Sequence, residues 1–359
     1  MRMRMNKYLI FAVALSVMLG GNLNAQSTSA SNLVSNGDFE KAGANSSVDG
    51  WKSEGEGAIS LDSEVKNAGK SALKITLEKK GNVTAECQRF SVIPGSQYLL
   101  SGWLRTEGFG PGSHQGVDAS LALLFFSNDK MTPRPDMLGC DPWTIGFPYG
   151  DVITWRSFTR LVTVPADATE AVIRISINSS KDKQTSICRI DNLRLSAYAP
   201  PKADGKAWVY EIGEKMALAS AEKIDDPDAT NGKAVRSMKD VQKPGTIVFG
   251  PYTKDQTAGQ YRISVRAKVD DNTAATPVFV MLLQANENIG SMTNILVVKG
   301  TDFKAPNSYQ EFEFEGVKPP AGNFEFPIYW SGKTNLWLDR ITVTTEKTFT
   351  PEETAAFWQ

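Results

Sequence analysis

Histidine and cysteine are scarce in this sequence of 359 residues, which contains one histidine and three cysteines. A catalytic Ser-His-Asp or Cys-His arrangement would have to use His114, which lies in a Gly-rich stretch without a nucleophile-elbow motif. The spacings of Cys87, Cys140 and Cys188 match no zinc motif, and they allow one disulfide with one thiol left over. The sequence therefore argues against the common hydrolase triads and against a His/Cys zinc centre.

An excess of charge of one sign is also lacking. The 39 Lys and Arg residues are balanced by 40 Asp and Glu residues, which gives a formal net charge of -1. Without a positive excess there is no electrostatic basis for binding nucleic acid or an anionic membrane. Two carboxylates would suffice for a glycosidase, so the many acidic residues leave that class of enzyme open.

Long apolar runs are absent apart from one near the start. The segment Tyr8–Leu19 is apolar over about a dozen residues, which is too short to span a bilayer comfortably. Basic residues precede it and small residues follow it, so residues 1–25 are predicted to be a signal peptide cleaved ahead of Gln26. No cysteine follows the run, so a lipid anchor is not indicated. We expect an exported protein, periplasmic or extracellular, with no membrane span.

What the chain does contain is a series of short segments in which apolar and polar residues alternate. This period of two is typical of β-strands, and no long amphipathic helix accompanies it. The segments end at Gly, Pro, Asn or Asp, which favour turns. In the first half we predict strands over 71–77, 88–93, 98–105, 119–126, 155–164, 171–177 and 187–195.

A Pro- and Gly-containing stretch, 200–206, is typical of a linker. After it we predict strands over 246–249, 261–269, 278–283, 295–298, 309–314, 324–330 and 335–344, and a short helix over 351–358. The two halves repeat one another: a turn Gly and a Tyr open a strand at Tyr98 and at Tyr261, and an Asp lies in the closing strand at Asp191 and at Asp339.

The opening stretch Asn32–Glu40 reads Asn-Leu-Val-Ser-Asn-Gly-Asp-Phe-Glu, and Gly50-Trp51 and Gly69–Ile75 follow it. With the later elements in the same order, this series resembles the CenC-like carbohydrate-binding modules of families four, nine and twenty-two, over about residues 32–197. The second half resembles the wider galactose-binding-like jelly roll more loosely, through segments 211–214, 228–235, 249–252 and 338–341.

The resemblance implies an all-β protein of two tandem jelly-roll β-sandwiches, which agrees with the alternation of apolar residues. We predict a carbohydrate-binding module over 26–198, a linker over 199–206, a second sandwich over 207–344 and a polar tail over 345–359. The two sandwiches leave no room for a separate catalytic domain.

Two surfaces of the first module are candidates for binding sugar, because aromatic faces stack on pyranose rings and polar groups bind hydroxyls. Alternation places Trp103 and Arg105 on one face of their strand. The alternative is that Trp103 packs in the core. Trp143 and Tyr149 lie in a long Pro- and Gly-rich loop, where aromatic residues either recognise a ligand or anchor the loop. Trp51 is expected in the core.

The resemblance also implies a structural calcium ion, far from the sugar and held by oxygen ligands. In the first module it implicates Glu40, Asp191 and a backbone carbonyl near Lys70. In the second half the matching pair is Glu214 and Asp339, with Glu211 as a rival to Glu214. The alternative for both pairs is that the carboxylates accept hydrogen bonds from backbone amides at the strand ends.

We therefore predict an exported, non-catalytic protein that binds polysaccharide, with a glycan-degrading enzyme as a candidate partner. Two alternatives stay open at this point. One is a jelly-roll glycoside hydrolase or polysaccharide lyase, and the other is an adhesive or structural protein of the cell envelope.

Overall fold

A computed structural model of the chain describes residues 31–44, 47–110, 117–134, 143–146, 150–198, 205–286, 292–320 and 322–358. The predicted signal peptide and most of the predicted linker lie outside these residues, as do Tyr149, His114 and Cys140. The described residues form two β-sandwiches, called the first and the second sandwich below, and each is described by itself.

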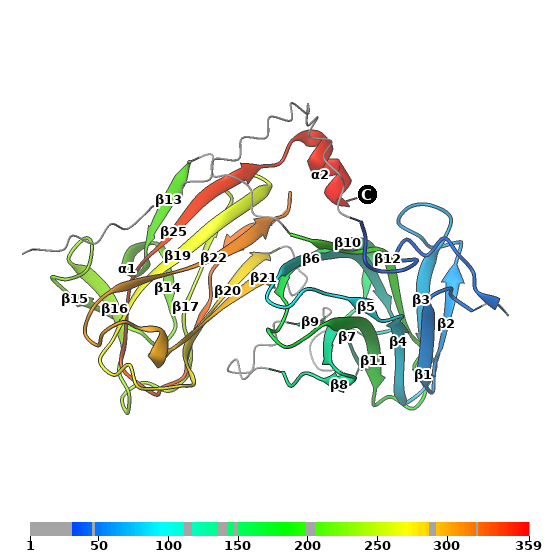
Figure 1. The fold of residues 1–359 in the computed structure, drawn as a ribbon, viewed down its shortest axis with the longest axis horizontal. Helices are drawn as coiled ribbons and strands as arrows, with labels where there is room; N and C mark the ends of the chain where they lie inside the picture. The colour runs from blue at the N-terminus through cyan, green and yellow to red at the C-terminus, as the bar shows by residue number, and fades with distance from the viewer. Residues whose placement is uncertain are drawn as a thin grey trace, which may run out of the picture. The chain divides into compact units, whose positions relative to one another are not determined.

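The first sandwich consists of two antiparallel sheets (Figure 1). Sheet 1 has the strand order β1 (Trp51–Gly55), β4 (Gly81–Cys87), β11 (Glu170–Ser179), β7 (Val117–Ser127) and β8 (Lys130–Met131), with β5 (Phe90–Ser91) on β11 and β9 (Thr144–Gly146) on β7. Sheet 2 has the order β10 (Val152–Thr163), β6 (Gln97–Glu107), β12 (Ser186–Ala197), β3 (Ala72–Leu77) and β2 (Ala58–Asp62).

The core of the first sandwich lies between these sheets because alternate residues of each strand point inward. In β6 the pattern is complete: Tyr98, Leu100 and Leu104 are buried, and the residues between them are half-buried on the outer face. Phe39 of the opening stretch is fully buried in this core, and its ring centroid lies 5.4 Å from that of Trp51. Trp51 is 7% exposed, so its predicted core position is confirmed.

The second sandwich also has two antiparallel sheets (Figure 1). Sheet 3 has the order β15 (Glu222–Asp225), β16 (Lys233–Ser237), β25 (Leu336–Thr348), β19 (Gly259–Val269) and β22 (Gln310–Lys318), with β13 (Ala207–Glu211) on β25. Sheet 4 has the order β14 (Ala217–Leu218), β17 (Gly245–Phe249), β24 (Ile328–Trp330), β20 (Pro277–Asn286), β23 (Asn323–Glu325) and β18 (Pro251–Thr253), with β21 (Met292–Lys299) on β20.

The predicted repeat is visible in these pairings. The strands that begin near Tyr98 and Tyr261, β6 and β19, each pair with the last strand of their own sandwich, β12 and β25. Those last strands carry Asp191 and Asp339, each 1% exposed. A second hydrophobic core, with Tyr261, Phe279 and Trp330 among its largest side chains, fills the second sandwich.

The prediction of an all-β fold of sandwiches is confirmed. Helix is confined to short segments of the described chain, α1 (Ile212–Lys215) and α2 (Pro351–Trp358), together with single turns. The predicted helix over 351–358 is therefore confirmed. The closing strand β25 runs to Thr348, four residues past the predicted end of the strand at residue 344, because it also pairs with β19 at Gly259.

Candidate functional site

Trp103 and Arg105 lie on the outer face of sheet 2, as the alternation predicts. Both side chains are half-buried. Trp103 is opposite Ser157 of β10 and Asp191 of β12 in the strand register. The alternative in which Trp103 packs in the core is therefore wrong.

Arg105 is part of an ion-pair network on this face. Its Nε donates to Glu107 Oε1 at 2.9 Å, and the same oxygen accepts from Arg189 Nη1 at 2.9 Å. Arg189 is 5% exposed, and its Nε donates to Asp62 Oδ2 at 2.8 Å. The Glu107 oxygen that holds Arg105 Nε also accepts from the buried Arg189, so the Arg105 side chain is held in place by a structural ion-pair network.

Trp143 does not present its ring to solvent. It is 7% exposed and packs edge-on against Phe125, with ring centroids 4.9 Å apart. Leu123 N also donates to the Trp143 carbonyl at 2.8 Å. The prediction that Trp143 stacks on sugar is corrected by this burial: Trp143 anchors its loop to the core. Tyr149 lies outside the described residues.

Glu40, Lys70 and Asp191 are brought together, as the resemblance implies. The amides of Asn67 and Ala68 donate to Asp191 Oδ2 at 2.8 and 3.1 Å, and the amide of Lys70 donates to Glu40 Oε1 at 2.7 Å. Backbone amides of one loop, 66–71, thus donate hydrogen bonds to both carboxylates. This is the arrangement that we gave as the alternative to a metal site.

The charge of this carboxylate pair is not balanced by a basic side chain within the described ranges of the chain. Burial raises the pKa of Asp191 above its ordinary value, and the nearby charge of Glu40 raises it further. Glu40 Oε2 also has no hydrogen-bond partner among the described residues. Two carboxylates and free oxygen lone pairs fit a hard cation such as calcium.

This placement corrects one expectation about the first sandwich. The ion was expected to lie far from the sugar, but Asp191 and Trp103 are directly opposite each other on neighbouring strands. Residues opposite each other in an antiparallel pair share one face of the sheet, with Cβ atoms about 5 Å apart. The predicted sugar surface and the predicted ion site are therefore neighbours on the outer face of sheet 2.

In the second sandwich, Asp339 forms ion pairs with the arginine side chains of residues 266 and 340. Arg266 Nη1 donates to Asp339 Oδ2, and the Thr230 amide donates to the same oxygen at 3.0 Å. Glu214 is exposed on α1, whereas burial and the charge of Asp339 raise the pKa of Glu211. Glu211, Glu214 and Asp339 line one pocket, so the predicted pair of Glu214 and Asp339 stays a prediction, with Glu211 as the nearer rival to Glu214. Glu211 is the carboxylate that interacts with Asp339, and a guanidinium compensates the charge.

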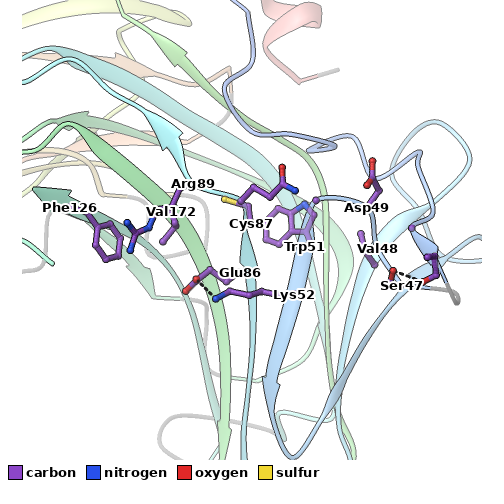
Figure 2. Close-up of a pocket in the computed structure, with 14 residues that line it drawn as sticks. Ser47, Val48, Asp49, Trp51, Lys52, Glu86, Cys87, Arg89, Phe126 and Val172 are labelled. Carbon is purple, nitrogen blue, oxygen red and sulfur yellow. Dashed lines mark hydrogen bonds and ion pairs between the residues drawn. The ribbon is translucent and has the colours of Figure 1, made fainter. Parts of the chain in front are cut away.

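A pocket of about 510 Å³ lies on the other sheet of the first sandwich, at the end where β1 begins and β4 ends (Figure 2). Figure 2 shows Arg89 and Phe126 at one end of this pocket and Asp49 at the other, with Trp51 and Cys87 between them. We call it the β1–β4 pocket. It is lined by Gly43, Ala44, Ser47, Val48, Asp49, Gly50, Trp51, Lys52, Glu86, Cys87, Gln88, Arg89, Phe126 and Val172.

The apolar part of the β1–β4 pocket is contributed by Val48, Trp51, Phe126 and Val172. Val48, Trp51 and Val172 are buried, and Arg89 Cζ lies 4.1 Å from the centroid of the Phe126 ring. The guanidinium therefore covers one face of Phe126 by a cation–π contact. Since Trp51 is almost fully enclosed as well, the pocket offers apolar edges and a stacked guanidinium to a ligand, with no large flat aromatic platform.

The polar part of the pocket divides into engaged and unengaged groups. Glu86 is engaged: its Oε1 lies 3.1 Å from Lys52 Nζ, and its Oε2 lies 2.6 Å from Arg174 Nη2. Although burial opposes it, these hydrogen bonds hold the pKa of Glu86 below its ordinary value, so Glu86 is ionised at neutral pH.

The unengaged groups are Asp49, Gln88 and part of Arg89. In the described chain, no partner contacts the Asp49 carboxylate or the side-chain amide of Gln88. Arg89 uses only Nη1, which donates to Asp129 Oδ1 at 2.6 Å and to Glu170 Oε2 at 3.2 Å. Arg89 Nε and Nη2 are therefore available. These three planar groups offer several donors and acceptors to a ligand.

The opening stretch holds this pocket in place. The Asn36 side chain donates to the carbonyls of Lys41 and Asp49 at 2.9 Å each and accepts from the Lys41 amide at 3.0 Å. Gly50 has φ 77°, a conformation that glycine adopts without strain. Its carbonyl accepts a hydrogen bond from the backbone amide of Gln88 at 2.9 Å. Asn36 and Gly50 thereby fix the positions of Asp49 and Gln88 on either side of the pocket.

The sequence did not predict this pocket, although the stretch Asn32–Glu40 and the pair Gly50-Trp51 stand out in it. Gln88 and Arg89 were included in a predicted strand. No group of three or more His, Cys, Asp or Glu residues with metal-binding geometry occurs in the described ranges. Within the same ranges, no helix is long and apolar enough to cross a membrane.

No protein-family model and no curated protein matches the chain. Among solved structures, the enzymatically active domain of tailspike protein 4 of bacteriophage CBA120 aligns with 16% identity and a TM-score of 0.35, over 46% of this chain and 21% of that chain. The CBM22-1–CBM22-2 tandem of Paenibacillus barcinonensis Xyn10C aligns with 12% identity and a TM-score of 0.31, over 89% and 98%.

The TmCBM61 module in complex with β-1,4-galactotriose aligns with 14% identity and a TM-score of 0.32, over 47% of this chain and 100% of that chain. The chain thus spans about a fifth of the tailspike structure and the full length of the binding modules. All three TM-scores are below 0.5, so these alignments do not establish the fold. The fold is defined by the sheets and cores given above.

Proposed function

We propose that this protein is an exported, non-catalytic polysaccharide-binding protein that binds its ligand in the β1–β4 pocket. The observation that supports this most is the combination in one pocket of about 510 Å³ of apolar side chains with three unengaged planar polar groups. Ligand pockets measure about 300–1,000 Å³ and combine an apolar lining with a few placed polar groups.

A pyranose ring suits these groups for chemical reasons. Its adjacent hydroxyls each donate and accept, so they match a carboxylate, an amide and a guanidinium, which are the free groups of Asp49, Gln88 and Arg89. Its C–H groups suit the partly exposed side chain of Phe126 at one end of the pocket. The outer face of sheet 2 at Trp103 is the second candidate surface, since its half-buried Trp is consistent with stacking on sugar.

Affinity electrophoresis of the mature protein tests this function. The gels contain xylan, β-glucan, laminarin, mannan or β-1,4-galactan. We expect one polymer to retard the protein and Arg89→Ala to relieve the retardation. Arg236→Ala is the matched control, because Arg236 is an ion-paired surface arginine of the second sandwich, outside both candidate surfaces. Trp103→Ala distinguishes the two surfaces. If no glycan retards the protein, the proposal is wrong, and release of reducing sugar or of unsaturated products would support an enzyme instead.

We further propose that Glu40 and Asp191 hold a calcium ion that stabilises the first sandwich. What supports this is the uncompensated carboxylate pair beside loop 66–71, with Glu40 Oε2 and lone pairs of Asp191 as the oxygens that would contact it. The ion would supply positive charge to the pair and take no part in sugar chemistry.

A further inference from the structure

Tyr252 of the second sandwich has an unusual backbone conformation. Its φ is +57°, a left-handed value that a bulky residue rarely adopts. It lies in an irregularity of the β18–β23 pairing, because Pro251 and Thr253 are opposite the adjacent residues Glu325 and Phe324. Such irregularities redirect side chains, and strained residues persist where the surrounding structure enforces them. The side chain of Tyr252 is therefore the feature that needs an explanation.

The ring of Tyr252 is directed outward. It is 49% exposed, which makes it the one aromatic residue among the large exposed apolar side chains of the described chain. One side of the ring packs on its own turn: a Cβ on Gly250 would lie 3.7 Å from Tyr252 Cδ2, and the Phe249 ring is 6.5 Å away in a T-shaped arrangement. The turn therefore supports the ring and leaves about half of it open to solvent.

Polar groups lie beside this ring. Burial and a hydrogen bond to Glu325 raise the pKa of the Tyr252 hydroxyl, so the hydroxyl donates to the carboxylate. Glu325 is 6% exposed and lies between Phe324 and Phe326 of the core, so it faces away from the core. Gln284 of β20 is opposite Glu325 and shares its face. An aromatic face, a carboxylate and an amide are thus adjacent on sheet 4.

We propose that Tyr252, Glu325 and Gln284 form a second glycan contact, on the second sandwich, which makes the chain bivalent for polysaccharide. The Tyr252 ring stacks on the C–H face of a pyranose, Gln284 binds one of its hydroxyls, and Glu325 holds the Tyr252 hydroxyl in position. This inference rests on the proposed function, because it assumes a polysaccharide ligand. Two linked contacts raise the affinity for a long polymer well above that for a fragment that occupies one contact.

Tyr252→Gly distinguishes binding from a structural role. Glycine adopts φ +57° without a steric penalty, which offsets part of the loss of the hydroxyl's contact with Glu325, so the melting temperature should change little while the binding ring is lost. Asp240→Gly is the matched control, because Asp240 has φ +65° and carries no aromatic ring. We expect it to keep or raise the melting temperature and to leave binding unchanged.

The readout is calorimetric titration of the full chain with an oligosaccharide of the polymer that retards it. We expect two sites per chain for the wild type and for Asp240→Gly, and one site each for Tyr252→Gly and Arg89→Ala. Retardation by the polymer should fall about tenfold in Tyr252→Gly. One site in the wild type that survives Tyr252→Gly and is lost in Arg89→Ala would overturn this inference and leave the proposed function intact. Absence of binding in all variants would overturn both.

Discussion

Removing calcium is expected to destabilise the first sandwich through Glu40 and Asp191. These carboxylates are wrapped by one loop, and no basic side chain in the described chain pairs with them. A ligand that binds only the folded state at 100 times its dissociation constant stabilises it by about 2.7 kcal/mol. For a sandwich of this size, each kcal/mol shifts the melting temperature by about 2–4 °C. We therefore expect a chelator to lower the melting temperature by roughly 5–11 °C.

The dependence of this effect on pH follows from Asp191. Burial, reinforced by the charge of Glu40, raises the folded-state pKa of Asp191 above 3.8. Without an ion, ionised Asp191 therefore disfavours folding, and this contribution recovers as pH falls through the raised pKa. A bound cation favours the ionised form, so the difference between calcium-loaded and chelated protein should shrink as the pH is lowered from 7 towards 4.

Differential scanning calorimetry with and without chelator measures both effects. Glu40→Gln and Asp191→Asn should abolish the response to chelator. Asp339→Asn should keep the response, because Arg266 already pairs with Asp339. A wild-type melting temperature that is the same with calcium and with chelator at pH 7 would refute the calcium site.

Two further predictions concern the buried side chains of Trp143 and Arg189. Trp143→Ala should lower stability by about 3–5 kcal/mol, measured by urea unfolding, and leave glycan retardation unchanged, since Trp143 packs against Phe125 in the core; loss of retardation with unchanged stability would contradict this. Arg189→Met should cost about 3 kcal/mol because it leaves Asp62 and Glu107 without a buried partner. Although burial opposes it, Arg189 and the amides of Val65 and Glu64 lower the pKa of Asp62, so this stabilisation is present above pH 3.8 and is lost as pH falls through the lowered pKa. A cost that does not decline in acid would contradict this assignment.

The long central strands β6 and β19 could be predicted because apolar and polar residues alternate along them, whereas the shorter central strands β4 and β16 were not predicted. In β6 and β19 alternate residues enter a core, so the period of two extends over the whole strand. Strands such as β1 and β15 are polar edge strands: β1 reads Trp-Lys-Ser-Glu-Gly and β15 reads Glu-Lys-Ile-Asp. Edge strands carry charged residues that discourage pairing with other chains, so their sequences lack the alternation and they were missed.

The candidate site was harder to predict than the fold. The pairing of Glu40 with Asp191 was recoverable, because each lies in a motif at one end of the first sandwich. The β1–β4 pocket was not, since it joins a loop near residue 49, the end of β4 and single residues of β7 and β11. Which residues meet there depends on strand register, and alternation alone does not fix register between strands far apart in sequence.

The burial of Trp143 was not predictable for a related reason. An aromatic residue in a long loop has the same sequence pattern whether it anchors the loop or binds a ligand. Its contact with Phe125 decides between these roles, and that contact depends on how the loop returns to sheet 1.

The dissociation constant of the glycan that retards the protein is the most direct test of binding in the β1–β4 pocket. Titration calorimetry should compare the wild type with Gln88→Ala, whose side chain is exposed and makes no contact in the described chain, so the fold is expected to be unchanged. We expect binding at this site to be about two- to tenfold weaker, since one neutral hydrogen bond to a hydroxyl is lost from a preformed pocket. An unchanged dissociation constant, with an unchanged melting temperature, would contradict this expectation.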